Sequence, residues 1–426
     1  MLAKENELLT RVGPGTPGGE LLRRYWQPVC AASELTAKRP KKRIKILDER
    51  LVVYRGYGGS YGLLEEHCSH RGASLYYGFV EERGIRCPYH GWLYDANGKC
   101  LEQPFEPKEA TFCQHIKHRA YPVQKLAGLL FAYMGPEPAP LLPRWDVLVR
   151  EDGVRKLATG MPLHCNWVQA QENAVDPTHS YFLHGCMFKE RGIPDPGGYT
   201  RPFIEYGFQP FEWGLLSSWH WGKDGGPIGE ERAGGNPLIF PNALGHAAGS
   251  SQWLLWRVPL DDTHTQIFSV EFQRSPDSQQ VEQPADPPVR FMPAWVDQDG
   301  EYNMESIIGQ DTMAWESQGP IADRTKEHLG ASDRGAVLFR QMLKEQIEIV
   351  QRGCEPMGLI REPERNEILE LPGLFVEGDP QLATVYGKRP AAVKPMASIF
   401  DHRHETLEVP FGAARPLTSR SPKSSS

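Results

Sequence analysis

The chain has 426 residues, of which 40% are hydrophobic and 24% are charged, and its formal net charge is -7. Because this length exceeds what one hydrophobic core usually supports, we expect at least two domains. The acidic charge and the lack of a long basic run exclude a nucleic-acid-binding footprint. The sequence has no apolar run long enough for a membrane span and no signal-peptide core, and its eight cysteines are scattered. We therefore predict a cytoplasmic protein in a reducing compartment.

The first part of the chain is predicted to form an extension and a small domain. Leucine-rich and Gly/Pro-rich segments alternate over 1–26, which predicts a helical N-terminal extension. Short β-type runs begin near Ile44 and predict an antiparallel β domain over 27–134. Residues 135–146 are rich in proline, which disfavours helices and central strands, so we place an interdomain linker there.

A larger mixed domain is expected over 147–410, followed by a serine-rich tail over 411–426 that we predict to be disordered. The periodicity of this domain predicts helices near 167–184, 304–318 and 332–351, and aromatic strands near 203–221 and 253–272.

Two similar cysteine–histidine arms lie in the predicted β domain. The four residues are Cys68 and His70 in the first arm, and Cys87 and His90 in the second. A [2Fe-2S] centre with two Cys on one iron and two His on the other needs this set of side chains. Gly72 and Gly91 would let both loops turn tightly. Structural zinc is the alternative, but common C2H2 zinc sites take both Cys from one arm and both His from the other.

This segment resembles the Rieske domain. In the respiratory and photosynthetic complexes that domain has an additional Cys in each loop, whereas this chain has Ala73 and Tyr89 at the matching positions. The resemblance is therefore to the low-potential oxygenase or ferredoxin branch. A Rieske ferredoxin would end near the linker at 135–146, but this chain continues well beyond it.

A second group of metal-binding residue types opens the larger domain. His179 and His184, with a carboxylate and open positions, would suit Fe(II) and O2. Five residues exceed one helical turn, so both rings can face one metal only if the helix bends or ends between them; Pro177 and Gly185 provide irregularity. Asp176 precedes His179 by three residues and could accept a hydrogen bond from its ring. The string resembles the mononuclear iron motif of Rieske oxygenases.

The third iron ligand has to come from a carboxylate farther along the chain. The candidates are Asp297, Asp299, Glu301, Glu305, Asp311, Glu316 and Asp323. Periodicity places Asp311 on a largely apolar helix face, together with Trp315 and Gln318. A carboxylate directed into a core needs a strong partner, and a metal ion is one; hydrogen bonds are the alternative. The segment around Asp311 also resembles the family segment that carries this ligand.

The resemblance covers about Leu8 to Arg361 and is to the homomeric branch with phthalate dioxygenase and 5,5'-dehydrodivanillate O-demethylase. It implies an α+β fold, with an antiparallel β Rieske domain and a helix-grip-like catalytic domain whose antiparallel sheet is flanked by helices. It also implies a [2Fe-2S] cluster, mononuclear Fe(II), a separate NAD(P)H-dependent flavin/iron-sulfur reductase and a homotrimer. In such a trimer, Asp176 would bridge a cluster His of one chain and His179 of the next. The sequence has no Gly-rich dinucleotide fingerprint after a strand, which agrees with an external reductase.

Three functions remain open from the sequence. We favour monooxygenation, such as O-demethylation of a methoxylated aromatic acid with O2; the alternatives are cis-dihydroxylation of an aromatic ring and a non-catalytic electron carrier. Arg201, Arg232 or Arg257 could bind a substrate carboxylate, although each is expected by default to be exposed or ion-paired. Phthalate itself is disfavoured, because 234–241 lacks the Arg that phthalate dioxygenases tend to place before a Phe-Pro pair.

Overall fold

The structure is a computed structural model, and it describes residues 1–371 except 108, 196–198, 201–202, 222–231, 249–250, 276–278 and 293–294. The end of the predicted catalytic domain at 410, the predicted tail over 411–426 and Arg201 lie outside the described residues, as does the side chain of Arg232.

The helices of the described chain are short, apart from the last one. Their bounds are α1 (Ala3–Thr10), α2 (Pro17–Leu22), α3 (Asp146–Val149), α4 (Trp167–Glu172), α5 (Met187–Glu190), α6 (Ile307–Glu316) and α7 (Arg334–Gln351). The 3-10 helices are η1 (Ala32–Glu34), η2 (Tyr57–Gly59), η3 (Leu75–Tyr77), η4 (Phe112–His115), η5 (Asn173–Val175), η8 (Ala331–Asp333) and η9 (Pro363–Asn366), and η6 (Ser180–Cys186) is a π-helix. None of the described helices is long and apolar enough to cross a membrane.

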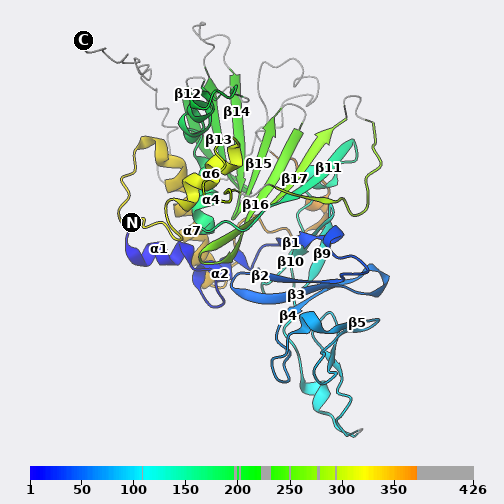
Figure 1. Cartoon of the computed structure of the whole chain (residues 1–426). Coiled ribbons are helices and arrows are strands. Elements are labelled where there is room, and N and C mark those ends of the chain that lie inside the picture. The colour runs from blue at the N-terminus through cyan, green and yellow to red at the C-terminus, as the bar shows by residue number, and fades with distance from the viewer. Residues whose placement is uncertain are drawn as a thin grey trace, which may run out of the picture.

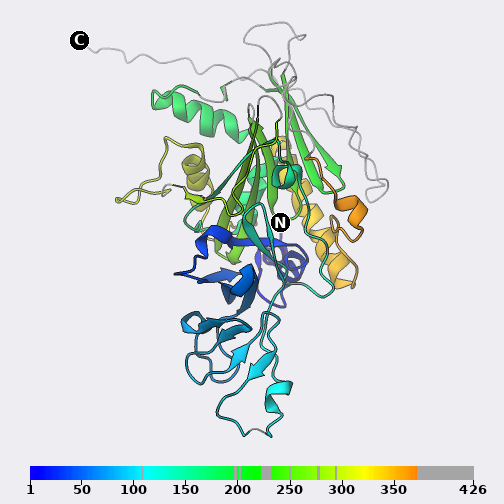
Figure 2. The same ribbon diagram turned by 90° about the vertical axis from the view of Figure 1, so that its right-hand side faces the viewer.

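The first part of the chain forms three small antiparallel sheets. Their strands are β1 (Gln27–Ala31), β2 (Lys41–Ile46), β3 (Glu49–Arg55), β4 (Tyr61–Glu65), β5 (Phe79–Glu81), β6 (Gly84–Arg86), β7 (Leu93–Tyr94), β8 (Cys100–Glu102), β9 (Val123–Leu126) and β10 (Leu129–Ala132). The orders are β1-β10-β9, β2-β3-β4 and β5-β6-β7-β8. Figures 1 and 2 show the β5-β6-β7-β8 sheet at one end of the molecule, away from the large sheet.

Strand β3 separates two hydrophobic cores. Its four consecutive apolar residues are buried, and alternate side chains of a strand point to opposite faces. Leu51 and Val53 belong to the main core, whereas Val52 and Tyr54 belong to a smaller core beside β5 to β8. The continuous apolar run is explained by burial on both faces.

The second part of the chain is built on one large sheet. Its strands are β11 (Gly153–Thr159), β12 (Phe203–Phe211), β13 (Gly214–Trp221), β14 (Arg232–Ile239), β15 (Ala243–Ala248), β16 (Ser251–Asp261), β17 (His264–Arg274) and β18 (Val289–Phe291). The order is β12-β13-β14-β15-β16-β17-β11-β18, and every pairing except β11 with β18 is antiparallel. Figure 1 shows α4, α6 and α7 gathered against this sheet. The predicted mixed α+β class is confirmed.

The main core joins the N-terminal helices, the β1-β10-β9 sheet and the large sheet into one packed unit. It contains Leu9 of α1, Phe131 of β10, Trp256 of β16 and Phe339 of α7. Phe131 and Trp256 make an edge-to-face contact with ring centroids 5.6 Å apart. The helices over 1–26 therefore pack on the large domain as well as on the strands that follow them.

Candidate metal centres

Two loops of the β5-β6-β7-β8 region have the same main-chain geometry. In the first, Cys68 N–H donates to Ala73 O at 2.9 Å, and Gly72 N–H donates to Cys68 O at 2.8 Å. In the second, Cys87 N–H donates to Trp92 O at 2.8 Å, and Gly91 N–H donates to Cys87 O at 3.1 Å. Both glycines have positive φ, +73° and +75°, which a side chain would strain. The loops can therefore present their Cys and His residues as a matched pair.

The four side chains of these loops meet. Cys68 and Cys87 are each 2% exposed, and the ring centroids of His70 and His90 lie 4.6 Å apart. Burial raises the pKa of the Cys68 thiol, and the neighbouring Cys87 raises it further. The Nδ1 atoms of both histidines are buried and have no hydrogen-bond partner in the structure. Buried nitrogens of this kind need a ligand, and an iron atom of a [2Fe-2S] cluster would supply it.

A second layer of side chains supports the first loop. The Tyr94 hydroxyl lies 3.2 Å from Cys68 Sγ, and the ring of Trp92 stacks on His70 at 4.4 Å. His118 is 1% exposed and joins Ser69 Oγ at 2.7 Å to the Glu65 carbonyl at 2.9 Å. His118 therefore ties the first loop to the end of β4.

The second site begins where helix α4 ends. Asn166 caps α4 by accepting a hydrogen bond from Val168 N–H at 3.1 Å. After η5 the chain enters the π-helix η6, with His179 as its N-cap and His184 inside it. Residues five apart are hydrogen-bonded neighbours in a π-helix, so both rings face the same side. A π-helix thus replaces the bend or break that the sequence led us to expect.

Hydrogen bonds fix the tautomers of both rings. The Gln310 side chain donates from Nε2 to Met304 O at 2.8 Å, so its Oε1 is the acceptor that faces His184 Nδ1 at 2.8 Å. His179 Nδ1 contacts the main-chain oxygen of Asp176, which can only accept. Each ring therefore carries its proton on Nδ1 and leaves Nε2 free as a ligand. Burial lowers the pKa of His184, which favours the neutral ring.

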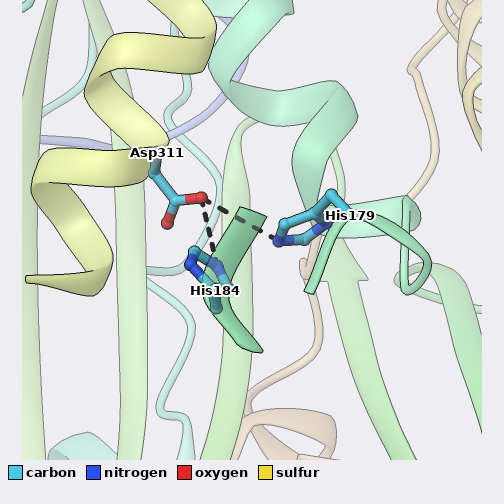
Figure 3. A group of neighbouring side chains, drawn as sticks. All are labelled: His179, His184 and Asp311. Carbon is cyan, nitrogen blue, oxygen red and sulfur yellow. Dashed lines mark ion pairs between the residues drawn. The ribbon is translucent and has the colours of Figure 1, made fainter. Parts of the chain in front are cut away.

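Asp311 of α6 lies opposite these two nitrogens. Its Oδ1 is 3.4 Å from His184 Nε2 and 3.9 Å from His179 Nε2. Figure 3 shows the three side chains directed toward one another. One ligand atom from each of the three residues can be chosen so that all lie within 4.8 Å of one another. Asn173 Nδ2 also donates to Asp311 Oδ1, at 3.3 Å. This set of two imidazoles and one carboxylate fits a mononuclear Fe(II).

The competing carboxylates are engaged elsewhere or exposed. Glu316 accepts from His164 N–H at 2.7 Å and from the Tyr302 hydroxyl at 3.0 Å. Asp323 pairs with Lys326 at 2.8 Å. The others lie in exposed turns: Asp297, Asp299, Glu301 and Glu305. The sequence motifs did not identify Gln310 or Asn173. Their roles became visible only in the structure, where Gln310 bonds His184 and Asn173 bonds Asp311.

The carboxylate of Asp176 has a different partner from the one expected. Its Oδ1 accepts from Thr178 N–H at 2.9 Å and from Thr178 Oγ1 at 2.7 Å, while its Oδ2 lies 3.8 Å from His179 Nδ1. The hydrogen bond to the ring goes to the Asp176 main chain instead, because the side chain folds back over the start of η6. Its side chain is 38% exposed, so one carboxylate oxygen is left for another partner.

Comparison with known proteins identifies the family. A family model described as the Rieske [2Fe-2S] domain matches residues 25–122, and one described as LigXa C-terminal domain like matches 295–370. The oxygenase subunit of 5,5'-dehydrodivanillate O-demethylase from Sphingobium sp. is 38% identical over 387 residues, which are 87% of this chain and 86% of that protein. The chain belongs to the Rieske non-haem iron oxygenases.

Further relatives agree with this family. Phenoxybenzoate dioxygenase subunit alpha from Ectopseudomonas oleovorans is 36% identical over 82% of this chain and 87% of that protein. The crystal structure of dicamba monooxygenase bound to dicamba shares the fold, with a TM-score of 0.57 and 16% identity over 78% of this chain and 99% of that one. The family expected from the sequence is confirmed, and so are the oxidoreductase activity and the two iron cofactors, a Rieske [2Fe-2S] cluster and a mononuclear iron.

Proposed function

We propose that this Rieske oxygenase removes a methyl group from a methoxylated aromatic acid. The observation that carries the proposal is the 38% identity to an O-demethylase oxygenase subunit over 87% of the chain, with both candidate ligand sets present. Hydroxylation of the methoxy carbon by O2, two electrons and two protons gives a hemiacetal and one water. The hemiacetal then breaks down to a phenol and formaldehyde. The second candidate is cis-dihydroxylation of an aromatic ring, which the phenoxybenzoate dioxygenase relative favours.

We assign the cofactor ligands from the geometry of the two sites. The proposed cluster ligands are Cys68, His70, Cys87 and His90, and the proposed mononuclear iron ligands are His179, His184 and Asp311. When bound, the cluster supplies single electrons and the mononuclear iron supplies O2 activation. The chain contributes the orientation of the ligands: Gln310 holds the ring of His184, and Asn173 holds the carboxylate of Asp311.

We further propose that electrons pass between subunits of a homotrimer. Figures 1 and 2 show the β5-β6-β7-β8 sheet and helices α4 and α6 in separate parts of one chain, so a neighbouring chain would bring a cluster closer. Asp176 would be the bridge, because its side chain is partly exposed and its main-chain oxygen contacts His179. A separate NAD(P)H-dependent reductase with flavin and iron-sulfur groups would supply the electrons, in the cytoplasm. The domain limits that go with this are 1–26, 27–134, 135–146, 147–410 and 411–426.

A product assay tests the proposed reaction. The purified chain is supplied with a surrogate reductase, NADH, labelled O2 and a panel of methoxylated and plain aromatic acids. Formaldehyde with the matching phenol supports O-demethylation, whereas a cis-diol with two labelled oxygens establishes the second candidate. Asp311→Ala is expected to lose the mononuclear iron and turnover while the visible absorption of the cluster stays unchanged. Retained activity in this variant would contradict the ligand assignment.

A further inference from the structure

Arg257 in β16 is a buried cation that forms no ion pair with the described part of the chain. It is 4% exposed, and its side-chain atoms Nε and Nη1 are buried with no hydrogen-bond partner among the described residues. The hydrogen bonds that Arg257 makes to described residues outside the strand pairing involve its main chain: its N–H donates to Asn242 O at 2.8 Å, and its carbonyl accepts from Asn242 Nδ2 at 3.1 Å. The sequence led us to expect an exposed or ion-paired arginine here, and that expectation was wrong. A buried charge with unmade hydrogen bonds is costly, and a protein retains one where a ligand completes it.

A second buried donor without an acceptor lies next to Arg257. The Cζ atom of Arg257 is 6.0 Å from the ring centroid of Trp315, whose side chain is 2% exposed. The indole Nε1 of Trp315 is buried and has no hydrogen-bond partner within the described ranges of the chain. Trp315 follows Asp311 by one turn of α6, so the two side chains share a face of that helix. The unmatched donors are therefore adjacent to the proposed iron ligands.

The charges near Arg257 favour a bound anion. Burial lowers the pKa of Arg257 to about 10, with the negative charge of Asp311 acting in the opposite direction, so the guanidinium stays positive at neutral pH. Burial also lowers the pKa of the nearby His246 to about 4, and Arg257 lowers it further, so His246 is neutral. Asp311 would compensate part of the charge of Fe(II). Arg257 would then have no anion left to balance it among the described residues.

The surface beside Arg257 is suited to a flat apolar group. Strand alternation places Trp253 and Leu255 on the same face of β16 as Arg257, opposite to Leu254 and Trp256 of the main core. The ring of His246 lies against Trp253, with centroids 5.6 Å apart. A binding site for an aromatic acid is expected to have apolar and aromatic side chains for the ring and one cation for the carboxylate, and this face of β16 has both.

We propose that Arg257 and the indole N–H of Trp315 bind the carboxylate of the substrate and so make the enzyme selective for aromatic acids. The guanidinium can donate two parallel hydrogen bonds to a carboxylate, which fixes the orientation of the ring as well as its position. The methoxy group would then be directed toward the proposed iron ligands. This inference rests on the proposed function, because it names the group by which that site recognises its substrate.

Ligand binding tests the inference without turnover. The cluster- and iron-loaded enzyme is titrated by calorimetry, without O2, with benzoate, 3-methoxybenzoate and 3-phenoxybenzoate, and with the corresponding amides. We expect the acids to bind roughly 10- to 150-fold more tightly than their amides, the ratio that corresponds to one hydrogen bond to a charged group. Amides that bind as tightly as the acids, or a lack of binding by every acid, would overturn the proposal.

Two variants and a control locate the effect. Arg257→Met is expected to abolish the preference for acids while leaving amide binding unchanged, and Arg257→Lys to retain part of it because a lysine keeps the charge but not the planar fork. Without ligand, Arg257→Met is expected to melt at the same temperature as the wild type or higher, because it removes an unpaired buried charge. Lys156→Met removes an exposed cation of the same sheet, 57% exposed, and should change neither affinity.

The outcomes separate this inference from the proposed reaction. If Arg257→Met still prefers acids, or if it unfolds while the wild type binds amides equally well, Arg257 is not the carboxylate site. Formaldehyde release from a neutral methoxylated substrate would leave the proposed reaction intact and remove only the role of Arg257. Tight binding of acids together with a cis-diol product would keep the role of Arg257 and overturn the proposed O-demethylation.

Discussion

Replacing Gln310 by leucine is expected to weaken the mononuclear iron site without changing any proposed ligand. The Gln310 side chain is fully buried and makes two 2.8 Å hydrogen bonds, one from His184 Nδ1 and one to Met304 O. Leucine has a similar volume but neither polar atom, so His184 is free to adopt the tautomer with its proton on Nε2. Loss of such an outer partner costs about 10- to 100-fold in metal affinity. This corresponds to about 1.4 to 2.7 kcal/mol.

Equilibrium dialysis against buffered Fe(II) without O2 measures this loss. The mononuclear iron is first removed with a chelator, and the visible absorption of the cluster confirms that the Rieske domain is intact. Gln318→Leu is the matched control, because Gln318 lies two residues beyond the end of α6 and is exposed, and among the described residues its side chain bonds only to the main chain of Ala314. An affinity of Gln310→Leu equal to that of Gln318→Leu would refute the role of the tautomer.

Three further changes test other parts of the structure. Asp176→Asn should keep its iron and be reduced by the reductase at the normal rate, yet turn over slowly in steady-state oxygen uptake; an unchanged rate would remove the proposed bridge. Tyr94→Phe removes the hydroxyl that lies 3.2 Å from Cys68 Sγ. Because hydrogen bonds to the sulfurs stabilise the reduced cluster, its potential should fall by about 20 to 65 mV in a redox titration, and an equal or higher value would contradict this. Glu172→Gln leaves the fully buried Arg324 without its ion pair at 3.1 Å. The free energy of unfolding should fall by about 3 to 5 kcal/mol in urea titrations, and a loss below about 1 kcal/mol would show that the pair is not needed.

The proposed metal ligands could be predicted from the sequence because most of them lie in short motifs of neighbouring residues. Each arm has a Cys followed within three residues by a His, and a Gly four residues after the Cys, so the two arms can be recognised without knowing the fold. Asp311 was selected by helix periodicity, and the structure places it next to both histidines.

The parts of the site that could not be predicted depend on contacts between distant segments. Gln310 is completely buried and Gln318 is exposed, although periodicity had put Gln318 on the buried face. Helix α6 ends at Glu316, so its periodicity does not extend to Gln318, whereas the contact of α6 with η6 buries Gln310 against His184. The π-helix has a related cause, since its wider turn brings His184 to Asp311, an interaction across more than a hundred residues that no local pattern records.

The position of β3 between the two hydrophobic cores indicates where segments of related Rieske oxygenases could be exchanged. Exchanging the whole segment 27–134 between relatives would cut across the main core, where Phe131 packs on Trp256. Exchanging 66–120 would instead leave the main core intact and divide only the small core, along the face of β3 and β4 that bears Val52, Tyr54 and Leu64. Chimaeras made at these limits would combine the electron-accepting properties of one parent with the substrate range of another.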